Sequence, residues 1–376
     1  MINPLSFYNS LKKHTNFITG VPDSLLKELN SVILDKHDEN NHIIAPNEGI
    51  CVSLGIGSFI ATNTIPTVYL QNSGLGNTIN PLISLADKDV YGIPMVLIVG
   101  WRGEPGLPDE PQHYKQGLIQ ENLMSSMGIK YFIISSSSLD YEDIIFRAYD
   151  YAKKEKTPVF IVVKKDTFSN YLKLDNGIKN ENLDSRELAI SNIISLFDET
   201  DSVIVATTGK ASRELYEQRK FIDDSSNNLD FLTVGGMGHA SSIATGISMS
   251  SGKRVICLDG DGALLMHMGS LVSNGKYAGN NFIHFILNNG VHESVGAQPT
   301  LINNVDIPKL ALSCGYKSSL RVSSMKELSE SKDVFLVKSG PVLIEYVIKP
   351  GSRVDLGRPQ EKPVDNLMNL MRQIRL

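Results

Sequence analysis

A strand-like run leads directly into a glycine-flanked carboxylate at Arg254-Val255-Ile256-Cys257-Leu258-Asp259-Gly260-Asp261-Gly262. Its apolar part is typical of a buried strand, and open α/β sheets bind their ligands at the carboxyl ends of such strands. A second apolar run, residues 282–287, ends at Asn288-Asn289. We therefore expect Asp261 and an asparagine to converge from two strand ends. Both side chains offer oxygen, which Mg²⁺ prefers, and the glycines let a phosphate approach the backbone closely.

The length and composition are those of a globular protein with two domains. The chain has 376 residues, 41% of them hydrophobic, and a formal net charge of −5. A negative charge is unfavourable for binding nucleic acid. Because no apolar run is long enough for a membrane span and no signal-peptide pattern opens the chain, we expect a cytoplasmic protein without a membrane partner. The widely spaced cysteines Cys51, Cys257 and Cys314 are expected to be buried thiols.

Strand-like runs alternate with helix-length segments in two sets along the chain. The first set comprises residues 17–19, 42–45, 67–70, 94–99, 131–134 and 159–163, and the second comprises residues 202–206, 231–234, 254–258, 282–287 and 342–347. Such alternation is typical of a doubly wound parallel sheet. The sequence therefore predicts two α/β domains, residues 1–167 and 185–376, joined by a polar, Asn-rich linker at 168–184.

Glu48 is a candidate for proton chemistry. It lies in Pro46-Asn47-Glu48-Gly49, where a strand-like run leads into an almost wholly apolar helical segment. A glutamate in the first turn of a helix is ordinarily a solvated residue that the helix dipole favours. A carboxyl group buried among apolar side chains instead has a raised pKa and can share a proton with a ring nitrogen. The residues alone leave both interpretations open.

Three further loops carry groups suited to a bound cofactor. In Gly20-Val21-Pro22-Asp23-Ser24, Asp23 fits either a helix N-cap or an acid that transfers protons. Thr207-Thr208-Gly209-Lys210 offers hydroxyl and amide donors to a diphosphate, although Lys210 alone is explained as a solvated helix residue. Gly235-Gly236-Met237-Gly238-His239-Ala240 has enough glycine for a ligand to approach closely, although core packing alone explains Met237.

Together these motifs resemble the phosphonopyruvate decarboxylases, a family of thiamine diphosphate-dependent 2-oxo acid decarboxylases. The resemblance spans almost the whole chain and also rests on Gln71-Asn72-Ser73-Gly74-Leu75-Gly76-Asn77, Trp101-Arg102-Gly103-Glu104-Pro105-Gly106, Asp109-Glu110-Pro111-Gln112-His113, Asn289-Gly290-Val291-His292-Glu293-Ser294 and Gly351-Ser352-Arg353-Val354-Asp355-Leu356-Gly357-Arg358-Pro359. In one departure, Ala297 stands where the family leads us to expect Gly. The resemblance implies the thiamine diphosphate-binding fold in both domains.

The resemblance also implies thiamine diphosphate held through Mg²⁺. Asp261, the side chain of Asn289 and the backbone carbonyl of Val291 would bind the metal. Glu48 would hydrogen-bond the aminopyrimidine ring, and Met237 would wedge between the two rings of the cofactor. The other residues that would bind the cofactor are Thr208, Gly209, Gly238, His239, Gly260, Gly262 and Ala263.

The implied reaction converts 3-phosphonopyruvate, a small anionic 2-oxo acid, to phosphonoacetaldehyde and CO₂. The candidates for proton transfer are Asp23, His113, His292 and Glu293. The phosphonate needs local cations, and the candidates in loop-like segments are Arg102, Lys115, Arg353 and Arg358, each of which is also explained by solvation.

The same resemblance implies a homodimer or homotetramer. Each active site would form between subunits, from the pyrimidine-binding N-terminal domain of one and the diphosphate-binding C-terminal domain of another. The nearest alternative function is that of a sulfopyruvate decarboxylase. A non-catalytic homologue that binds thiamine diphosphate is a second alternative, which the intact Glu48, Asp261 and Asn289 disfavour.

Overall fold

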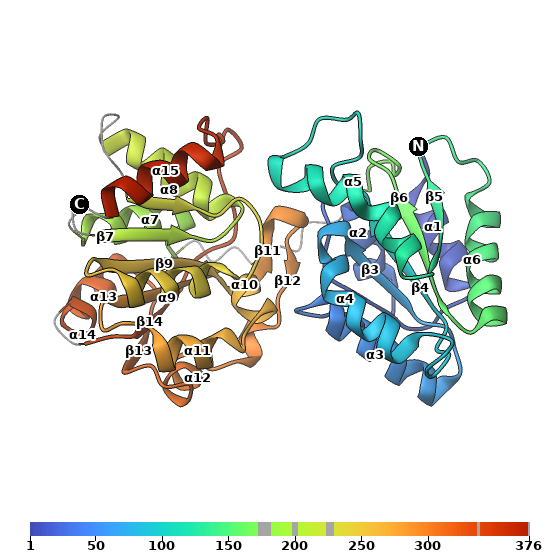
Figure 1. Cartoon of the computed structure of the whole chain (residues 1–376), viewed down its shortest axis with the longest axis horizontal. Coiled ribbons are helices and arrows are strands. Elements are labelled where there is room, and N and C mark those ends of the chain that lie inside the picture. Colours follow the sequence, from blue (N-terminus) through green and yellow to red (C-terminus); the bar gives the residue numbers. More distant parts are fainter. Residues whose placement is uncertain (172–181, 198–201, 223–228, 337–338, 375–376) are drawn as a thin grey trace. The chain divides into compact units, whose positions relative to one another are not determined.

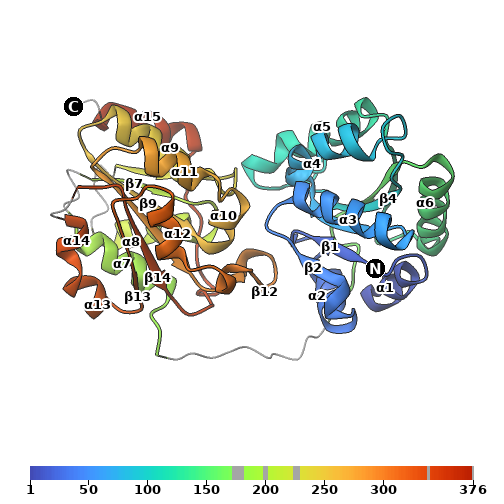
Figure 2. The same cartoon turned by 90° about the horizontal axis from the view of Figure 1, so that it is seen from below.

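The structure is a computed structural model that describes the chain except for residues 172–181, 198–201, 223–228, 337–338 and 375–376. The chain divides into two compact units, Met1–Asn176 and Gly177–Leu376. Figures 1 and 2 show the N-terminal unit in blue to green and the C-terminal unit in yellow-green to red. Most of the predicted linker 168–184 lies outside the described residues. The domain boundaries therefore remain predictions.

The N-terminal unit contains a six-stranded sheet in the order β2-β1-β3-β4-β6-β5. Every pair of neighbouring strands is parallel. All residues of β4 and β6 are buried, which a parallel sheet covered on both faces requires. The strands are β1 (Ile18–Gly20), β2 (His42–Ile44), β3 (Thr67–Gln71), β4 (Met95–Gly100), β5 (Lys130–Ile134) and β6 (Pro158–Val163).

Helices cover both faces of this sheet. One face packs against α1 (Pro4–Lys12), α2 (Lys27–Lys36) and α6 (Tyr141–Glu155). The other face carries α3 (Glu48–Thr62), α4 (Leu75–Pro81) and α5 (Pro111–Ser126) (Figure 2). This division follows from right-handed crossovers, because α2 and α6 connect strands in one direction across the sheet and α3, α4 and α5 connect them in the other.

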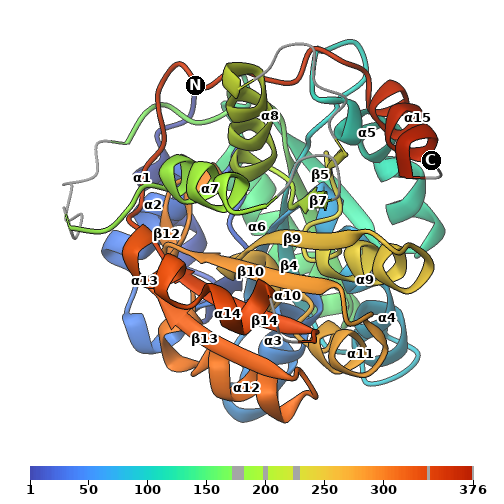
Figure 3. The same ribbon diagram turned by 90° about the vertical axis from the view of Figure 1, so that its left-hand side faces the viewer.

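The C-terminal unit repeats this architecture with a six-stranded parallel sheet in the order β13-β14-β10-β9-β7-β8. In Figure 3 the C-terminal unit faces the viewer. The strands are β7 (Ser202–Ala206), β8 (Asp230–Leu232), β9 (Arg254–Gly260), β10 (Phe282–Asn288), β13 (Ser318–Val322) and β14 (Val342–Val347). The edge strand β13 was not predicted, because the sequence Ser-Ser-Leu-Arg-Val is half polar and most of the strand is only partly buried.

Two groups of helices cover this second sheet. One face packs against α7 (Arg186–Ser195), α8 (Lys210–Ile222), α13 (Met325–Glu330) and α14 (Lys332–Leu336). The opposite face packs against α9 (Ala240–Ser250), α10 (Asp261–Met266), α11 (Ser270–Tyr277), α12 (Ile307–Ser313) and α15 (Pro363–Ile374). A short antiparallel pair, β11 (Val291–His292) and β12 (Gln298–Pro299), follows β10. The prediction of two doubly wound parallel sheets is confirmed.

Each sheet contains a point at which the connections from two neighbouring strands leave in opposite directions across the sheet. This point lies between β1 and β3 in the N-terminal unit and between β7 and β9 in the C-terminal unit. Ligands of open α/β sheets bind at the carboxyl ends of the strands beside such a reversal. The loops predicted to carry the functional site follow β1 to β4 and β7 to β10, so they lie at these positions.

Two expectations from composition have a structural outcome. Cys51 and Cys257 are buried as expected, whereas Cys314, the C-cap residue of α12, is only half-buried. All three are free thiols. No helix in the described part of the chain is long and apolar enough to cross a membrane.

Candidate active site

Glu48 is the first residue of α3 and is buried. Asn47 caps this helix, because its Oδ1 accepts a hydrogen bond of 2.8 Å from the N–H of Gly49. The Glu48 side chain accepts a hydrogen bond of 2.7 Å at Oε2 from Nδ2 of Asn77. Burial raises the pKa of Glu48, and the bond from Asn77 partly opposes that rise. The structure thus favours a buried carboxyl with a raised pKa over a solvated one.

Gly74 makes room for the Glu48 carboxyl. A Cβ atom at residue 74 would come within 2.2 Å of Glu48 Oε1. Gly74 and Asn77 both belong to the loop and helix that follow β3. The motif at residues 71–77 supports the resemblance, but its contact with Glu48 was not predicted. That contact depends on the packing of α4 against α3, for which the sequence has no local signal.

Asp23 follows β1 and is fully buried. Burial raises its pKa to about 6, while the backbone N–H of Leu25 and the charge of Arg102 limit the rise. Neither carboxyl oxygen forms a hydrogen bond of good geometry with a described residue. The N-cap interpretation is wrong, because α2 begins at Lys27 and its N-cap residue is Leu26. Asp23 is therefore a buried acid that follows the carboxyl end of β1.

Arg102, after β4, is already engaged by a carboxylate. Its Nε and Nη2 donate to Asp109 at 2.9 and 2.5 Å, and its Nη1 donates to Ser24 Oγ at 2.8 Å. Burial opposes ionisation of Asp109, but the Arg102 guanidinium holds the pKa of this carboxyl well below its usual range. Because Asp109 neutralises its charge, Arg102 is a weaker candidate for binding a phosphonate.

His113 and Lys115 lie on α5 in different environments. His113 is buried, and its Nδ1 has no hydrogen-bond partner among the described residues. Burial and the nearby Arg102 lower the pKa of His113 to about 4, so the imidazole is neutral near pH 7. Lys115 is exposed and forms no ion pair with a described residue. Its charge is therefore available to an anion.

In the C-terminal unit, Met237 and His292 converge on Gly262. A Cβ atom at residue 262 would come within 3.0 Å of the His292 ring and 3.3 Å of Met237 Cε. Burial lowers the pKa of His292 to about 4. A neighbouring glycine, Gly238, is also closely packed, since a Cβ there would lie 2.6 Å from His267 Cδ2 and its φ is +84°. Residues from the loops after β8, β9 and β10 thus meet at Gly262.

The remaining predicted cofactor residues lie on the same carboxyl edge. Thr208, after β7, donates from Oγ1 to the carbonyl of Val234 at 2.8 Å. The next residue, Gly209, has φ +98° and lies near Ser294, whose Oγ would be 3.3 Å from an added Cβ. The ring of His239 is 4.5 Å from that of His267. Gly260 ends β9, and Ala263 is buried in α10.

The predicted metal ligands are oxygen donors. Asp261 is buried, and its Oδ2 accepts a hydrogen bond of 2.6 Å from Thr300 Oγ1. Burial raises the pKa of Asp261 to about 6. Asn289 donates from Nδ2 to Glu293 at 2.8 Å, and its Oδ1 accepts from the N–H of Val291 at 3.1 Å. A buried carboxylate beside amide and carbonyl oxygens fits a hard divalent cation such as Mg²⁺.

Two cationic side chains contact the carboxylate of Glu293. Its Oε2 accepts a bond of 2.6 Å from Arg186 Nη1, and Nζ of Lys210 lies 3.3 Å from Oε1. Burial opposes ionisation, but Arg186 and Lys210 together lower the pKa of Glu293 below its ordinary value. An ionised, fully engaged carboxylate is a poor proton donor, which disfavours the predicted role in proton transfer. Lys210 also donates to Ser352 Oγ at 2.6 Å, so it is not the solvated residue that charge alone suggests.

Arg353 connects the C-terminal segment 351–358 to two helices of its own unit through ion pairs. Its guanidinium contacts Glu187 on α7 at 2.9 Å and also Glu217 on α8. The N–H of Gly357 donates to Glu217 at 2.6 Å. The charge of Arg353 is thus compensated, which weakens its candidacy as a phosphonate ligand. Arg358 lies in the same segment and is exposed.

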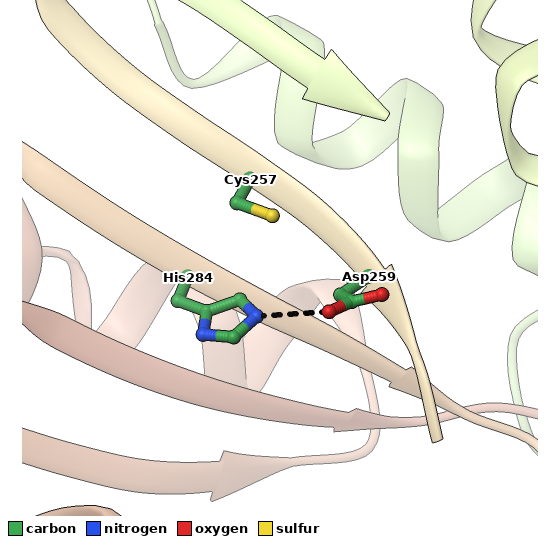
Figure 4. Close-up of side chains that lie close together, drawn as sticks. All are labelled: Cys257, Asp259 and His284. Atoms are coloured by element: carbon green, nitrogen blue, oxygen red, sulfur yellow. Dashed lines mark ion pairs between the residues drawn. The ribbon is translucent and has the colours of Figure 1, made fainter. Parts of the chain in front are cut away.

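A buried cluster of Cys257, Asp259 and His284 lies beside the Asp261 turn (Figure 4). The potential ligand atoms of all three lie within 4.8 Å of one another. His284 Nε2 is 3.4 Å from Asp259 Oδ2, and its Nδ1 is 3.0 Å from the hydroxyl of Tyr316. Because both imidazole nitrogens face protein groups, we interpret the cluster as a polar contact between the neighbouring strands β9 and β10, in which His284 pairs with Cys257.

Comparison with known proteins identifies the class. Residues 6–125 match the family model described as "Thiamine pyrophosphate enzyme, N-terminal TPP binding domain". Residues 207–346 match "Thiamine pyrophosphate enzyme, C-terminal TPP binding domain". Thiamine pyrophosphate is a synonym of thiamine diphosphate. Both units are thus domains of a thiamine diphosphate enzyme, and the cofactor prediction is confirmed.

Similarity to individual proteins narrows the family. The chain is 32% identical over 364 residues to a phosphonopyruvate decarboxylase of Streptomyces viridochromogenes, covering 93% of this chain and 88% of the relative. It is 32% identical over 371 residues to one of Streptomyces hygroscopicus, covering 92% and 87%. A sulfopyruvate decarboxylase of Methanosarcina acetivorans is 26% identical over 382 residues, covering 94% and 93%. The chain belongs to this family of thiamine diphosphate-dependent decarboxylases and is a carboxy-lyase.

Proposed function

We propose that the enzyme converts 3-phosphonopyruvate to phosphonoacetaldehyde and CO₂ without oxidation, in phosphonate biosynthesis. The observation that carries this proposal is the 32% identity to two phosphonopyruvate decarboxylases over more than nine-tenths of the chain. The sulfopyruvate relative is aligned over a similar length at lower identity, 26%. A sulfonate carries one less negative charge than a phosphonate dianion, so the two substrates differ in the cationic partners they need.

Most of the predicted residues have a role in the proposed reaction. Thiamine diphosphate, when bound, supplies the carbon nucleophile and accepts the electron pair that decarboxylation releases. Glu48 shares a proton with the aminopyrimidine ring, and its burial and raised pKa support this role. Asp261, Asn289 and the carbonyl of Val291 hold Mg²⁺. The diphosphate and thiazolium are bound by Thr208, Gly209, Met237, Gly238, His239, Gly260, Gly262 and Ala263.

In the proposed reaction Asp23 transfers a proton to the substrate, and His113 and His292 assist it. With a pKa of about 6, Asp23 is the group best matched to exchange a proton near neutral pH. His113 and His292, with pKa values of about 4, are neutral there and serve as hydrogen-bond partners. Among the four predicted phosphonate ligands, we favour Lys115 over Arg102 and Arg353, whose charges carboxylates already compensate.

Steady-state assays with both substrates test the proposed specificity. Purified enzyme with Mg²⁺ and thiamine diphosphate is offered phosphonopyruvate and sulfopyruvate, and release of aldehyde and CO₂ is measured. We expect kcat/KM for phosphonopyruvate to exceed that for sulfopyruvate by at least about 10-fold, which corresponds to one charge-assisted contact. A preference for sulfopyruvate would make the alternative correct, and no turnover of either would favour a binding homologue.

We also propose a homodimer or homotetramer in which Glu48 and Asp261 of one site come from different subunits. Support comes from α3, the helix that begins with Glu48, because its apolar side chains Ile50 and Ile60 are 44% and 72% exposed. Mixing inactive Glu48→Gln and Asp261→Asn variants under subunit exchange tests this. Hybrids would contain a complete site and recover activity. Absence of recovery, with hybrid formation verified, would place both residues in one subunit.

A further inference from the structure

We propose that Asn77 is a positioning residue for Glu48. The side-chain amide of Asn77 donates a hydrogen bond to Oε2 of Glu48 and so leaves Oε1 of Glu48 to exchange the proton with the cofactor. The inference rests on the role of Glu48 proposed above. It assigns to Asn77 a function that the sequence did not suggest.

Asn77 approaches the first turn of α3 with both its side chain and its backbone. Its Nδ2 donates to Glu48 Oε2 at 2.7 Å. Its carbonyl oxygen would lie 2.7 Å from a Cβ atom at residue 49, so it packs directly over Gly49. The other carboxyl oxygen, Oε1, lies against Gly74. The two glycines and the amide thus fix the plane of the carboxyl group.

The chemistry of an amide gives the two oxygens of Glu48 different roles. The Nδ2 group of an asparagine only donates hydrogen bonds and does not titrate. In a protonated carboxyl group the carbonyl oxygen is the better acceptor and the hydroxyl oxygen is the donor. Donation from Asn77 to Oε2 therefore favours the proton on Oε1, from which it can pass to a ring nitrogen.

Among the described neighbours of Glu48, no charged side chain offers another means of setting the Glu48 pKa. Cys51 on α3 interacts with Glu48, Tyr69 on β3 interacts with Cys51, and His42 on β2 lies 3.0 Å from the Tyr69 hydroxyl. Burial raises the pKa of Cys51 to about 12 and that of Tyr69 well above its ordinary value, and burial lowers the pKa of His42 to about 4. All three are neutral near pH 7, so loss of the Asn77 amide raises the Glu48 pKa further.

Proton uptake on cofactor binding measures this effect without any turnover. Calorimetric titration of the enzyme with thiamine diphosphate and Mg²⁺, in buffers of different ionisation enthalpy, gives the number of protons bound at each pH. A protonated Glu48 brings its own proton to the ring nitrogen, whereas an ionised Glu48 must take one from solvent. The pH at which uptake begins therefore follows the Glu48 pKa.

Three variants make the test specific. Asn77→Leu removes the donor at nearly constant shape and should shift the onset of uptake upward by about one pH unit, the size of one hydrogen bond to a charged group. Asn77→Asp places a second carboxyl beside Glu48 and should shift it upward as well; it also serves if the leucine variant does not fold. Asn80→Leu, on the same helix but exposed, is the control and should leave the onset unchanged.

The outcomes separate the two proposals. An onset in folded Asn77→Leu or Asn77→Asp equal to that of the wild type would overturn the inference about Asn77. Retained turnover in Glu48→Gln would instead overturn the proposed function of Glu48. If both hold, the Asn77→Leu shift disappears in the Glu48→Gln background, because no carboxyl remains to titrate.

Discussion

Buried carboxyl groups behave differently in the two units of the molecule. In the N-terminal unit, Glu48 and Asp23 form no ion pair with a described residue, and burial raises their pKa values. In the C-terminal unit, Glu293 is held by Arg186 and Lys210, which lower its pKa. These surroundings suit Glu48 and Asp23 to proton exchange and Glu293 to a fixed negative charge. Asp261, in the same unit as Glu293, forms no ion pair with a described residue, and burial raises its pKa to about 6.

The largest effect on stability should come from removing Arg186, the buried counterion of Glu293 in the C-terminal unit. Arg186→Met leaves Glu214 and Glu293 buried without their guanidinium partner. We expect a loss of about 3–5 kcal/mol in the free energy of unfolding, measured by denaturant titration. Arg147→Met removes an ion pair of two exposed residues and should cost no more than about 0.5 kcal/mol. Equal effects would show that Arg186 is not a buried counterion.

Asp23 in the N-terminal unit is a buried carboxyl group without an ion pair to a described residue, so its substitution should have the opposite effect. Its folded pKa of about 6 lies above the ordinary value of 3.8, so its contribution to stability is lost as pH rises from about 4 through 6. Asp23→Asn should therefore stabilise the protein by about 2–3 kcal/mol near pH 7 and by little near pH 4, while turnover falls. Unfolding titrations at both pH values measure this. A variant less stable at pH 7 would contradict a raised pKa.

Gly74→Ala tests whether the Glu48 carboxyl needs the space beside residue 74. The new Cβ would lie 2.2 Å from Glu48 Oε1 and must displace the carboxyl. We expect a stability cost of about 1–2 kcal/mol and a fall in kcat of at least about 10-fold. Gly76→Ala, two residues further along in α4, meets no atom within 4 Å and provides the control. Equal activity of the two alanine variants would show that Gly74 does not shape the site.

The smallest effect concerns the loop beside the metal ligands. Ala297 has φ +56°, a left-handed conformation that explains why a glycine is expected there. Ala297→Gly should relieve this strain and stabilise the protein by about 0.5–1 kcal/mol, after the greater flexibility of glycine in the unfolded chain is allowed for. Thermal unfolding measures the change. A destabilised variant would mean that other contacts of Ala297 outweigh the strain.

The sequence predicted those features that local patterns encode. Continuous apolar runs revealed the central strands, and the apolar segment after Glu48 pointed to its burial. The half-polar edge strand β13 has no such pattern and was missed. Partners distant along the chain were also missed, because Arg186 and Glu293 are 107 residues apart and Glu48 and Asn77 are 29 apart. These contacts depend on which helices pack together, which residue spacing does not reveal.

We propose that Glu48 exchanges a proton with the cofactor during decarboxylation of phosphonopyruvate. The most direct measurement compares wild-type and Glu48→Gln enzyme for release of CO₂ and phosphonoacetaldehyde, with cofactor binding measured in parallel. We predict turnover by the wild type and a loss of at least about 10²-fold in the variant, which still binds thiamine diphosphate and Mg²⁺. Turnover by Glu48→Gln at a rate near that of the wild type would contradict the account.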